Sequence, residues 1–251
     1  MSIDIKNVDC IHGMRNFVES ESIDMVLTSP PYDNLRKYDN VCVWNFEKFK
    51  EVAKEWVRVL KDGGVIVWVV NDQTKNGGET GTSFKQVLHF MELGLKLNDT
   101  MIWRKTNPMP QMKQPRYSPC FEYMFVLSKG KPKTFNPLMR KTKCGGIKYD
   151  STCKNMGGES GRTKKNFTIK DEAVDYNVWD IAISQNKTKH PAVFPEELAM
   201  RHIKSWTNEG DVVLDPFMGY GTTAIVCKKN DRNCIGFEIS KEYYEECINR
   251  L

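Results

Sequence analysis

Two short motifs contain residue types that could carry out group transfer. The first is TSPPY at Thr28–Tyr32, where a hydroxyl, two prolines and an aromatic ring follow a strand-like apolar run. A hydroxyl and a carbonyl oxygen can accept hydrogen bonds from an amino group, and an aromatic ring can stack on a base swung out of a duplex. Ser29, Pro30, Pro31 and Tyr32 are therefore candidate catalytic residues for chemistry on an exocyclic amino group.

The second motif is DPFMGYGTT at Asp215–Thr223, in which Gly219 and Gly221 fit the G-x-G-x-x-[GA] turn of nucleotide binders. Glycine is needed where a strand turns sharply into a helix and a ligand approaches the backbone. By itself this pattern also fits NAD binding or a purely structural turn.

Two acidic residues beside the glycine turn narrow the choice of cofactor. Asp215 is expected at the end of a strand, where it can accept a hydrogen bond from an ammonium group, and Glu238 follows the next strand, where it can accept from ribose hydroxyls. S-adenosylmethionine (SAM) has an ammonium group and a ribose but no pyrophosphate. The pair of acids therefore favours SAM over a dinucleotide.

Alternating strand and helix patterns are expected to position both motifs. The predicted strands are Ile23–Leu27, Val65–Val70, Leu97–Arg104, Cys120–Gly130, the VVLDPF run and the CIGFEI run. The predicted helices are Phe46–Leu60, Ser83–Leu95, Pro195–Thr207, one from Thr222 and one from Lys241. This order indicates an α/β fold with a mostly parallel sheet and helices on both faces. TSPPY would then lie at the carboxyl end of a strand, where such sheets bind ligands.

Length and composition fit one sizeable α/β domain with a small appendage. The chain has 251 residues, shows no apolar stretch of membrane-spanning length and begins without a secretory signal pattern, so we expect an intracellular protein with no membrane partner. Eight scattered cysteines without a C-x-x-C pattern indicate reduced thiols, and Cys144 and Cys153 lack a nearby histidine for a zinc site. No metal site is predicted.

Positive charge is concentrated in one segment. Between Lys129 and Lys170 there are twelve Lys and Arg residues against two acidic ones, although the net charge of the whole chain is only +5. The segment lacks apolar periodicity and contains two Gly-Gly pairs, which indicates an insertion. It could bind a phosphate backbone or form a solvated charged loop. Lys143, Lys148, Arg162, Lys164 and Lys165 are the candidate DNA-binding residues.

Together these residues resemble the permuted β group of DNA N4-cytosine and N6-adenine methyltransferases, in which the catalytic S/D-P-P-Y precedes the cofactor motif. The resemblance extends to Asp9, to Leu60–Gly64, to the EYMFVLSKG segment, to Trp179 and to His190–Ile203. It implies a doubly wound, mostly parallel, seven-stranded Rossmann-like sheet that is circularly permuted and has a small insertion for target recognition. Tyr220 departs from the family, which commonly has Ser at that position.

The resemblance also implies a division of the chain and a cofactor site. Residues 1–130 would form the catalytic half, 131–177 the target-recognition insertion and 178–251 the cofactor-binding half. SAM is the implied cofactor. Its implied binding residues are Asp9, Thr28, Phe194, Pro195, Asp215, Pro216, Phe217, Gly219, Gly221, Thr222, Thr223 and Glu238.

Double-stranded DNA is the implied substrate, in the cytoplasm of a prokaryote or a phage-infected cell. The resemblance leaves open a homodimer and a cognate restriction endonuclease. SPPY favours N4 of cytosine over N6 of adenine, whose enzymes usually have DPPY. A C5-cytosine enzyme would need a Pro-Cys nucleophile, and Pro119-Cys120 is expected to be structural because it opens a strand.

Two other classes of protein are alternatives to a DNA amino-methyltransferase. A methyltransferase acting on RNA or on a protein amide could use a similar loop, but the basic insertion and the permuted order argue against it. A dinucleotide-binding protein or a catalytically silent DNA-binding protein would have no use for the complete TSPPY loop. The sequence therefore predicts a site-specific, SAM-dependent DNA methyltransferase.

Overall fold

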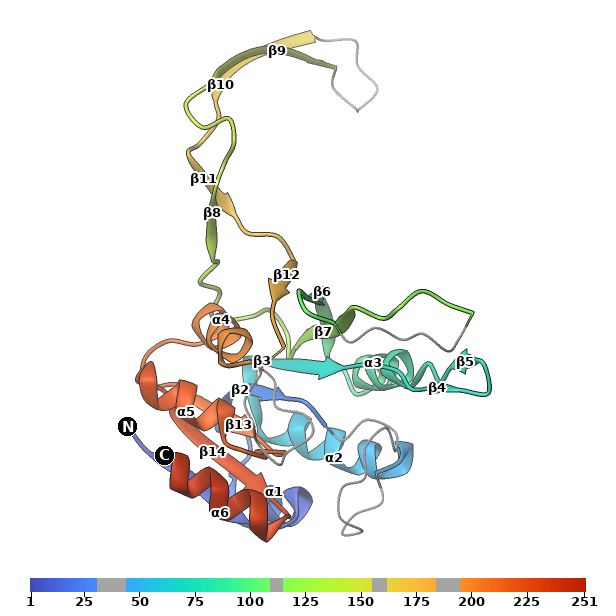
Figure 1. The fold of residues 1–251 in the computed structure, drawn as a ribbon. Helices are drawn as coiled ribbons and strands as arrows, with labels where there is room; N and C mark the ends of the chain where they lie inside the picture. Colours follow the sequence, from blue (N-terminus) through green and yellow to red (C-terminus); the bar gives the residue numbers. More distant parts are fainter. Residues whose placement is uncertain (31–43, 109–114, 155–161, 184–194) are drawn as a thin grey trace. The chain divides into compact units, whose positions relative to one another are not determined.

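The computed structural model describes residues 1–30, 44–108, 115–154, 162–183 and 195–251, with 149–154 and 162–167 described by their backbone only (Figure 1). The described residues form two compact units. The larger unit comprises Met1–Asn136 and Asn177–Leu251, and the smaller unit comprises Pro137–Tyr176. The larger unit carries the glycine motif and the start of TSPPY, and the smaller unit carries most of the basic segment.

An eight-stranded sheet is the centre of the larger unit among the residues described, in the order β1-β14-β13-β2-β3-β7-β6-β12. The bounds are β1 (Ile3–Asn7), β14 (Asn233–Glu238), β13 (Val212–Asp215), β2 (Ile23–Thr28), β3 (Leu60–Val70), β7 (Phe121–Ser128), β6 (Lys96–Lys105) and β12 (Val178–Ile181). Neighbouring strands are parallel except at β7, which runs against β3 and β6. The predicted mostly parallel α/β sheet is confirmed. The expected count of seven strands was too low because short β12 pairs with β6 at the edge.

The strand order reverses between β13 and β2. From β13 the chain continues through α5 (Thr222–Lys229) to β14 on one side, and from β2 it continues through α2 (Phe46–Val59) to β3 on the other side. In open α/β sheets ligands bind outside the carboxyl ends of the strands at such a switch point. Thr28 and Asp215 are the last residues of these two strands.

Helices cover both faces of the sheet. One buried core joins α1 (Cys10–Phe17), α2 and α3 (Thr82–Glu92) to Ile66, Trp68 and Val70 of β3. Val65, Val67 and Val69 alternate with these residues and are also buried, so they belong to the opposite face. That face is covered by α4 (Glu196–Trp206), α5 and α6 (Lys241–Arg250). Within the described chain no helix is long and apolar enough to span a membrane.

Most predicted elements lie within a few residues of the observed ones, but two features near β3 and α1 were not expected. β3 begins at Leu60, five residues before the predicted strand, so Leu60–Gly64 is part of an 11-residue strand. Backbone bonds from Gly63 N to Lys129 O (2.7 Å) and from Lys129 N to Gly64 O (3.1 Å) extend the pairing. Helix α1 has only eight residues, too few for a clear periodic pattern.

The smaller unit consists of two antiparallel strand pairs. β8 (Met139–Lys141) pairs with β11 (Glu172–Val174), and β9 (Lys148–Lys154) pairs with β10 (Arg162–Thr168). A tight turn lies between β8 and β9, where Gly146 has φ +78° and a Cβ on Gly145 would lie 2.5 Å from Asp171 Oδ1. The Gly145-Gly146 pair is therefore required by this turn. A two-stranded hairpin in the larger unit joins β4 (Thr74–Lys75) to β5 (Gly78–Glu79).

Candidate active site

A buried hydrogen bond joins the ends of β2 and β13 at the switch point. Thr28 Oγ1 donates to Asp215 Oδ1 at 2.7 Å, and Thr28 is fully buried. Ser29 and Pro30 follow Thr28 directly, with Pro30 buried and Ser29 partly exposed. The first half of TSPPY therefore starts beside the glycine motif, although 187 residues separate Thr28 from Asp215 in the chain. Pro31 and Tyr32 lie outside the described residues.

Asp215 is a buried carboxylate held by neutral donors. Besides Thr28, Thr223 Oγ1 donates to its Oδ2 at 2.6 Å and Phe217 N donates to its Oδ1 at 3.1 Å. Burial raises the pKa of Asp215 to about 6, and the bonds from Thr223, Thr28 and Phe217 oppose that rise. Asp215 thus joins the end of β2 to the start of α5, and a cation beside it would favour its charged form.

The glycine turn between β13 and α5 needs both of its glycines. Gly219 has φ +51° and Gly221 has φ +80°, the left-handed region that side chains with a Cβ rarely adopt. A Cβ on Gly221 would also lie 2.5 Å from Cys247 Sγ of α6. Cys247 is buried, and the six cysteines that the structure describes form no disulfide bonds.

Glu238 contacts the glycine turn from the end of β14. Its Oε2 accepts from Gly219 N at 2.7 Å and its Oε1 accepts from Ser240 N at 2.8 Å. Burial raises the pKa of Glu238, while the two backbone bonds lower it and the charge of Asp215 adds to the rise. Each carboxylate oxygen can accept a second bond, so Glu238 keeps acceptor capacity for ligand hydroxyls.

Asp9 lies at the end of the strand next to β14. β1 pairs with β14 so that Asn7 lies opposite Glu238, and Val8 N donates to Glu238 O at 3.0 Å. Asp9 Oδ1 caps α1 by accepting from Ile11 N (3.0 Å) and His12 N (3.2 Å). Its Oδ2 lies 3.8 Å from Lys48 Nζ. Asp9 and Glu238 thus follow adjacent strand ends.

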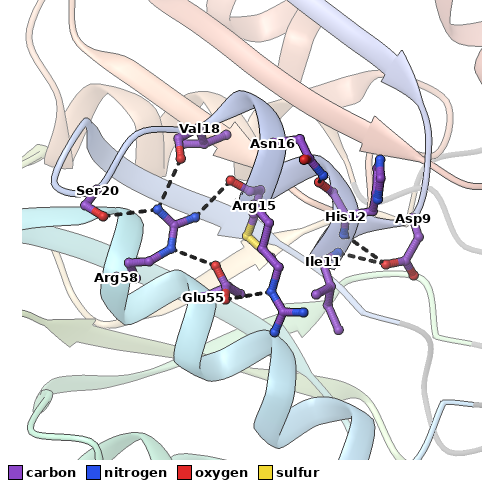
Figure 2. Close-up of polar contacts among 10 residues, drawn as sticks. Asp9, Ile11, His12, Arg15, Asn16, Val18, Ser20, Glu55 and Arg58 are labelled. Atoms are coloured by element: carbon purple, nitrogen blue, oxygen red, sulfur yellow. Dashed lines mark hydrogen bonds and ion pairs between the residues drawn. The ribbon is translucent and has the colours of Figure 1, made fainter.

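A polar network fixes α1, which carries Asp9 at its start, against α2 (Figure 2). Glu55 accepts from Arg15 Nε at 3.0 Å and from Arg58 Nε at 2.7 Å, while Arg58 donates to the Met14 and Val18 carbonyl oxygens. Burial alone would raise the pKa of Glu55, but the bonds from Arg58 and Arg15 outweigh it and hold the pKa below its ordinary value. The network therefore sets the orientation of the helix that Asp9 caps.

The structure adds Trp44 to the residues identified from sequence. Its ring meets the partly buried Phe217 ring edge to face, with centroids 5.1 Å apart, and the centroid of the Trp56 ring lies 6.2 Å from that of Phe217. Trp44 immediately precedes Asn45, the N-cap of α2, whose side chain accepts from Lys48 N at 2.9 Å. An aromatic residue before a helix cap was the only sequence signal for this contact.

Of the remaining predicted cofactor residues, two lie at the glycine turn, one lies at the start of α4 and one lies outside the described residues. Pro216 is buried between Asp215 and Phe217, and Thr222 is the first residue of α5. Pro195 is the buried N-cap of α4, which packs against α5. Phe194 lies outside the described residues.

Cys120, the residue that a C5-cytosine enzyme would need as a nucleophile, directly precedes β7. Its carbonyl oxygen accepts from Lys105 N at 2.7 Å.

The predicted DNA-binding residues belong to the smaller unit. Lys143 and Lys148 are exposed, and Arg162, Lys164 and Lys165 are described as backbone positions of β10. Lys164 lies opposite Thr152 and Lys165 opposite Ser151 in the β9–β10 register. Lys148, Arg162, Lys164 and Lys165 thus lie along an antiparallel ribbon, and Lys143 lies in the turn before it.

Comparisons with known proteins agree with this geometry. A family model described as DNA methylase, of the N6/N4 methyltransferases, matches residues 23–249. The orphan methyltransferase M.BamHII of Bacillus amyloliquefaciens is 48% identical over 248 residues, covering 95% of this chain and 92% of that protein. The type II methyltransferase M.HpaI of Haemophilus parainfluenzae is 32% identical, covering 97% of this chain and 72% of that protein.

Solved structures show the same fold. The M1.HpyAVI–SAM complex matches with a TM-score of 0.64 and 25% identity, covering 99% of this chain and all of that chain. The PvuII cytosine-N4-specific DNA methyltransferase matches with a TM-score of 0.71 and 19% identity, covering 100% of this chain and 86% of that chain. The chain therefore belongs to the N6/N4 DNA methylase family and is a SAM-dependent DNA methyltransferase.

Proposed function

We propose that this enzyme methylates N4 of cytosine in double-stranded DNA, on a base swung out of the duplex, with N6 of adenine as the second candidate. The observation that carries the proposal is the Thr28–Asp215 hydrogen bond of 2.7 Å. This bond joins Thr28, the residue before Ser29, to Asp215, the acidic residue before the glycine turn, at the switch point of the sheet. TSPPY precedes the glycine motif in the chain, which supports the permuted β-group order.

The residues around the glycine turn fit SAM. Glu238 has acceptor capacity left for the ribose hydroxyls, and buried Asp215 lacks a cation among the donors described, which suits an ammonium group. Asp9 would accept from the adenine amino group, and Phe217 would contact the ligand beside the turn. Thr28, Pro195, Pro216, Gly219, Gly221, Thr222, Thr223 and Phe194 would complete the site. When bound, SAM supplies the methyl group on its sulfonium.

The loop after β2 would act on the target base. The lone pair of an exocyclic amino nitrogen is delocalised into the ring, so the amino group must be oriented and its hydrogens bound. Ser29 Oγ and the Pro30 carbonyl would accept those N–H bonds, Pro31 would hold the loop rigid, and Tyr32 would stack on the base. Ser29 in place of an acidic residue favours cytosine over adenine.

The division of labour along the chain follows from this assignment. Residues 1–130 would supply the catalytic half, 178–251 the cofactor half, and 131–177 the target recognition. Lys143, Lys148, Arg162, Lys164 and Lys165 would contact phosphates. A homodimer and a restriction endonuclease partner remain predictions from the resemblance. The descriptions of the relatives differ in what they suggest about an endonuclease partner, because M.BamHII is described as an orphan methyltransferase and M.HpaI as a type II methyltransferase.

Substitutions in the TSPPY loop test the proposed roles. Ser29→Ala should lower turnover by about tenfold or more, because one acceptor for the amino group is lost. Tyr32→Ala should lose a stacking contact of roughly 1–3 kcal/mol. Ser29→Asp is the matched control, since it keeps an acceptor and should retain more activity than Ser29→Ala.

Methyl transfer would be measured in single-turnover assays, and SAM affinity by calorimetry on the same proteins. Both alanine variants should bind SAM as the wild type does, because the residues act after the cofactor is bound. Unchanged turnover in both variants would exclude the loop from catalysis.

A further inference from the structure

A buried ion pair lies at the same edge of the sheet as the start of TSPPY. Lys105, the last residue of β6, and Glu122, the second residue of β7, have their Nζ and Oε1 atoms 2.6 Å apart. β7 runs antiparallel to β3 and β6, so the start of β7 lies beside the carboxyl ends of both strands. β2 ends at this edge too, and Ser29 follows it. Glu122 is therefore two strands away from Ser29.

The strand register also places Glu122 and Ser29 on one face of the sheet. Thr28 lies opposite Trp68, and Trp68 lies opposite Phe125, so these three residues share the face that α2 and α3 cover. Because side chains alternate along a strand, Ser29, one residue beyond Thr28, belongs to the other face. Glu122, three residues before Phe125, belongs to that other face too.

Stability does not explain why this ion pair is buried. The side chains of Lys105 and Glu122 are 18% and 7% exposed, so both lose much of their hydration. A buried ion pair stabilises a fold little, and apolar residues of similar size often do as well or better. Lys105 is also held by Trp103, since its Nζ lies over that ring at 5.3 Å from the centroid. An ammonium group has three donors, so a fixed and partly exposed one is suited to bind an acceptor on a ligand.

The separation of Ser29 from the ion pair fits a pyrimidine. Neighbouring strands lie about 4.8 Å apart, so the two intervals from β2 to β7 span about 10 Å. A hydrogen bond of about 3 Å at each end leaves roughly 4 Å between the bonded atoms of a ligand. The amino nitrogen and the 2-keto oxygen of cytosine are separated by about this length. A cytosine over the end of β3 could therefore reach both sides.

We propose that the Lys105 ammonium group donates a hydrogen bond to the 2-keto oxygen of the flipped cytosine, while Ser29 accepts from its amino group. This inference rests on the proposed function, because it takes cytosine as the target base. Lys105 contacts the substrate, and Glu122 is a positioning residue that acts through Lys105. The bond holds the ring at a fixed distance from Ser29, which orients the amino group for methyl transfer.

Removal of the target base from the DNA tests this contact. The methylation site of the enzyme is first mapped by sequencing, and two duplexes that contain it are compared, one intact and one abasic at the target cytosine. Lys105→Met should bind the intact duplex about tenfold or more weakly than the wild type does, because a charge-assisted hydrogen bond is lost. It should bind the abasic duplex as the wild type does, whereas a merely structural role would weaken binding to both duplexes.

A second variant and a control keep the comparison interpretable. Lys105→Met combined with Glu122→Gln leaves neither charge of the pair buried alone, and it should show the same loss on the intact duplex only. Lys61→Met is the matched control, because Lys61 Nζ lies 2.7 Å from Asp24 Oδ2 in an ion pair near the starts of β2 and β3. This control should bind both duplexes as the wild type does.

Fluorescence anisotropy measures the DNA affinities in the presence of a SAM analogue that cannot transfer its methyl group. Calorimetry with SAM checks that each variant keeps its cofactor site. Equal losses of affinity on the two duplexes, or no loss on either, would overturn the inference. The base that the wild type methylates is measured separately and tests the proposed function, so the two failures are distinguishable.

Discussion

Asp215 shows how one residue can serve the fold and the cofactor site together. Its three described donors, Thr28, Thr223 and the Phe217 amide, are neutral, and they do not remove the cost of burying a negative charge. That cost raises the pKa to about 6. A cationic ligand group beside Asp215 would offset it, which links the cofactor affinity to the charge on this carboxylate.

We therefore predict that SAM affinity falls as the pH drops through about 6. Protonated Asp215 attracts an ammonium group less, and affinity should fall by up to roughly tenfold per pH unit below the pKa. Calorimetry between pH 5 and 7 measures this dependence. Asp215→Asn should flatten most of it, and any remaining slope is expected from Glu238, whose pKa is also raised. An identical slope in wild type and Asp215→Asn would contradict the assignment.

The Asp215 carboxylate should affect the free energy of unfolding in the opposite direction. SAM affinity rises with pH, whereas the folded state becomes less stable. Because the pKa is raised from 3.8 to about 6 by folding, the folded state holds a proton that the unfolded state releases. Its stabilising contribution is complete below about pH 4 and is lost as the pH rises to about 6, an effect of roughly 3 kcal/mol at most. Urea unfolding without SAM should show this pH dependence in wild type and lack it in Asp215→Asn. If the free energy of unfolding depended on pH in the same way in wild type and in Asp215→Asn, this prediction would be wrong.

Individual site residues could be identified from sequence only where a local pattern surrounds them. Asp215 and Glu238 stand at strand ends beside a glycine turn, and the structure has them there. The Thr28–Asp215 bond could not be predicted, because it depends on which strands are neighbours in the sheet. Trp44 was missed for the same reason, since its contact with Phe217 comes from distant parts of the chain.

At the scale of elements, periodic apolar patterns predicted the long helices and buried strands. Helix α2 was expected at Phe46–Leu60 and lies at Phe46–Val59. The elements of the smaller unit were missed because β9 (KYDSTCK) and β10 (RTKKNFT) have few apolar residues. Their pairing is defined by backbone hydrogen bonds, for which apolar periodicity gives no signal.

The β9–β10 ribbon gives a prediction at this scale. If its basic residues contact phosphates, replacing Lys164 and Lys165 by Ala should weaken binding to every DNA sequence. The slope of log K against log salt should become shallower by roughly 0.9 per lost contact. Fluorescence anisotropy at several salt concentrations measures it. Lys54→Ala with Lys241→Ala, which removes two exposed lysines elsewhere, is the control. A slope that matches this control would mean that the ribbon is only a solvated charged surface.

For the whole molecule, the sequence predicts the class of fold but not the order of its strands. The alternation of strands and helices indicated a mostly parallel sheet, which the structure has. The position of β13 between β14 and β2 depends on tertiary packing, and this position creates the switch point where Thr28 meets Asp215.

The identity of the methylated base tests the central claim most directly. DNA treated with the enzyme and SAM would be digested to nucleosides and analysed by mass spectrometry, with Ser29→Ala as the control. We predict N4-methylcytosine, greatly reduced in the control. N6-methyladenine would change the target base but keep the amino-group mechanism. Finding only 5-methylcytosine, lost in Cys120→Ser and unaffected in Ser29→Ala, would contradict the account.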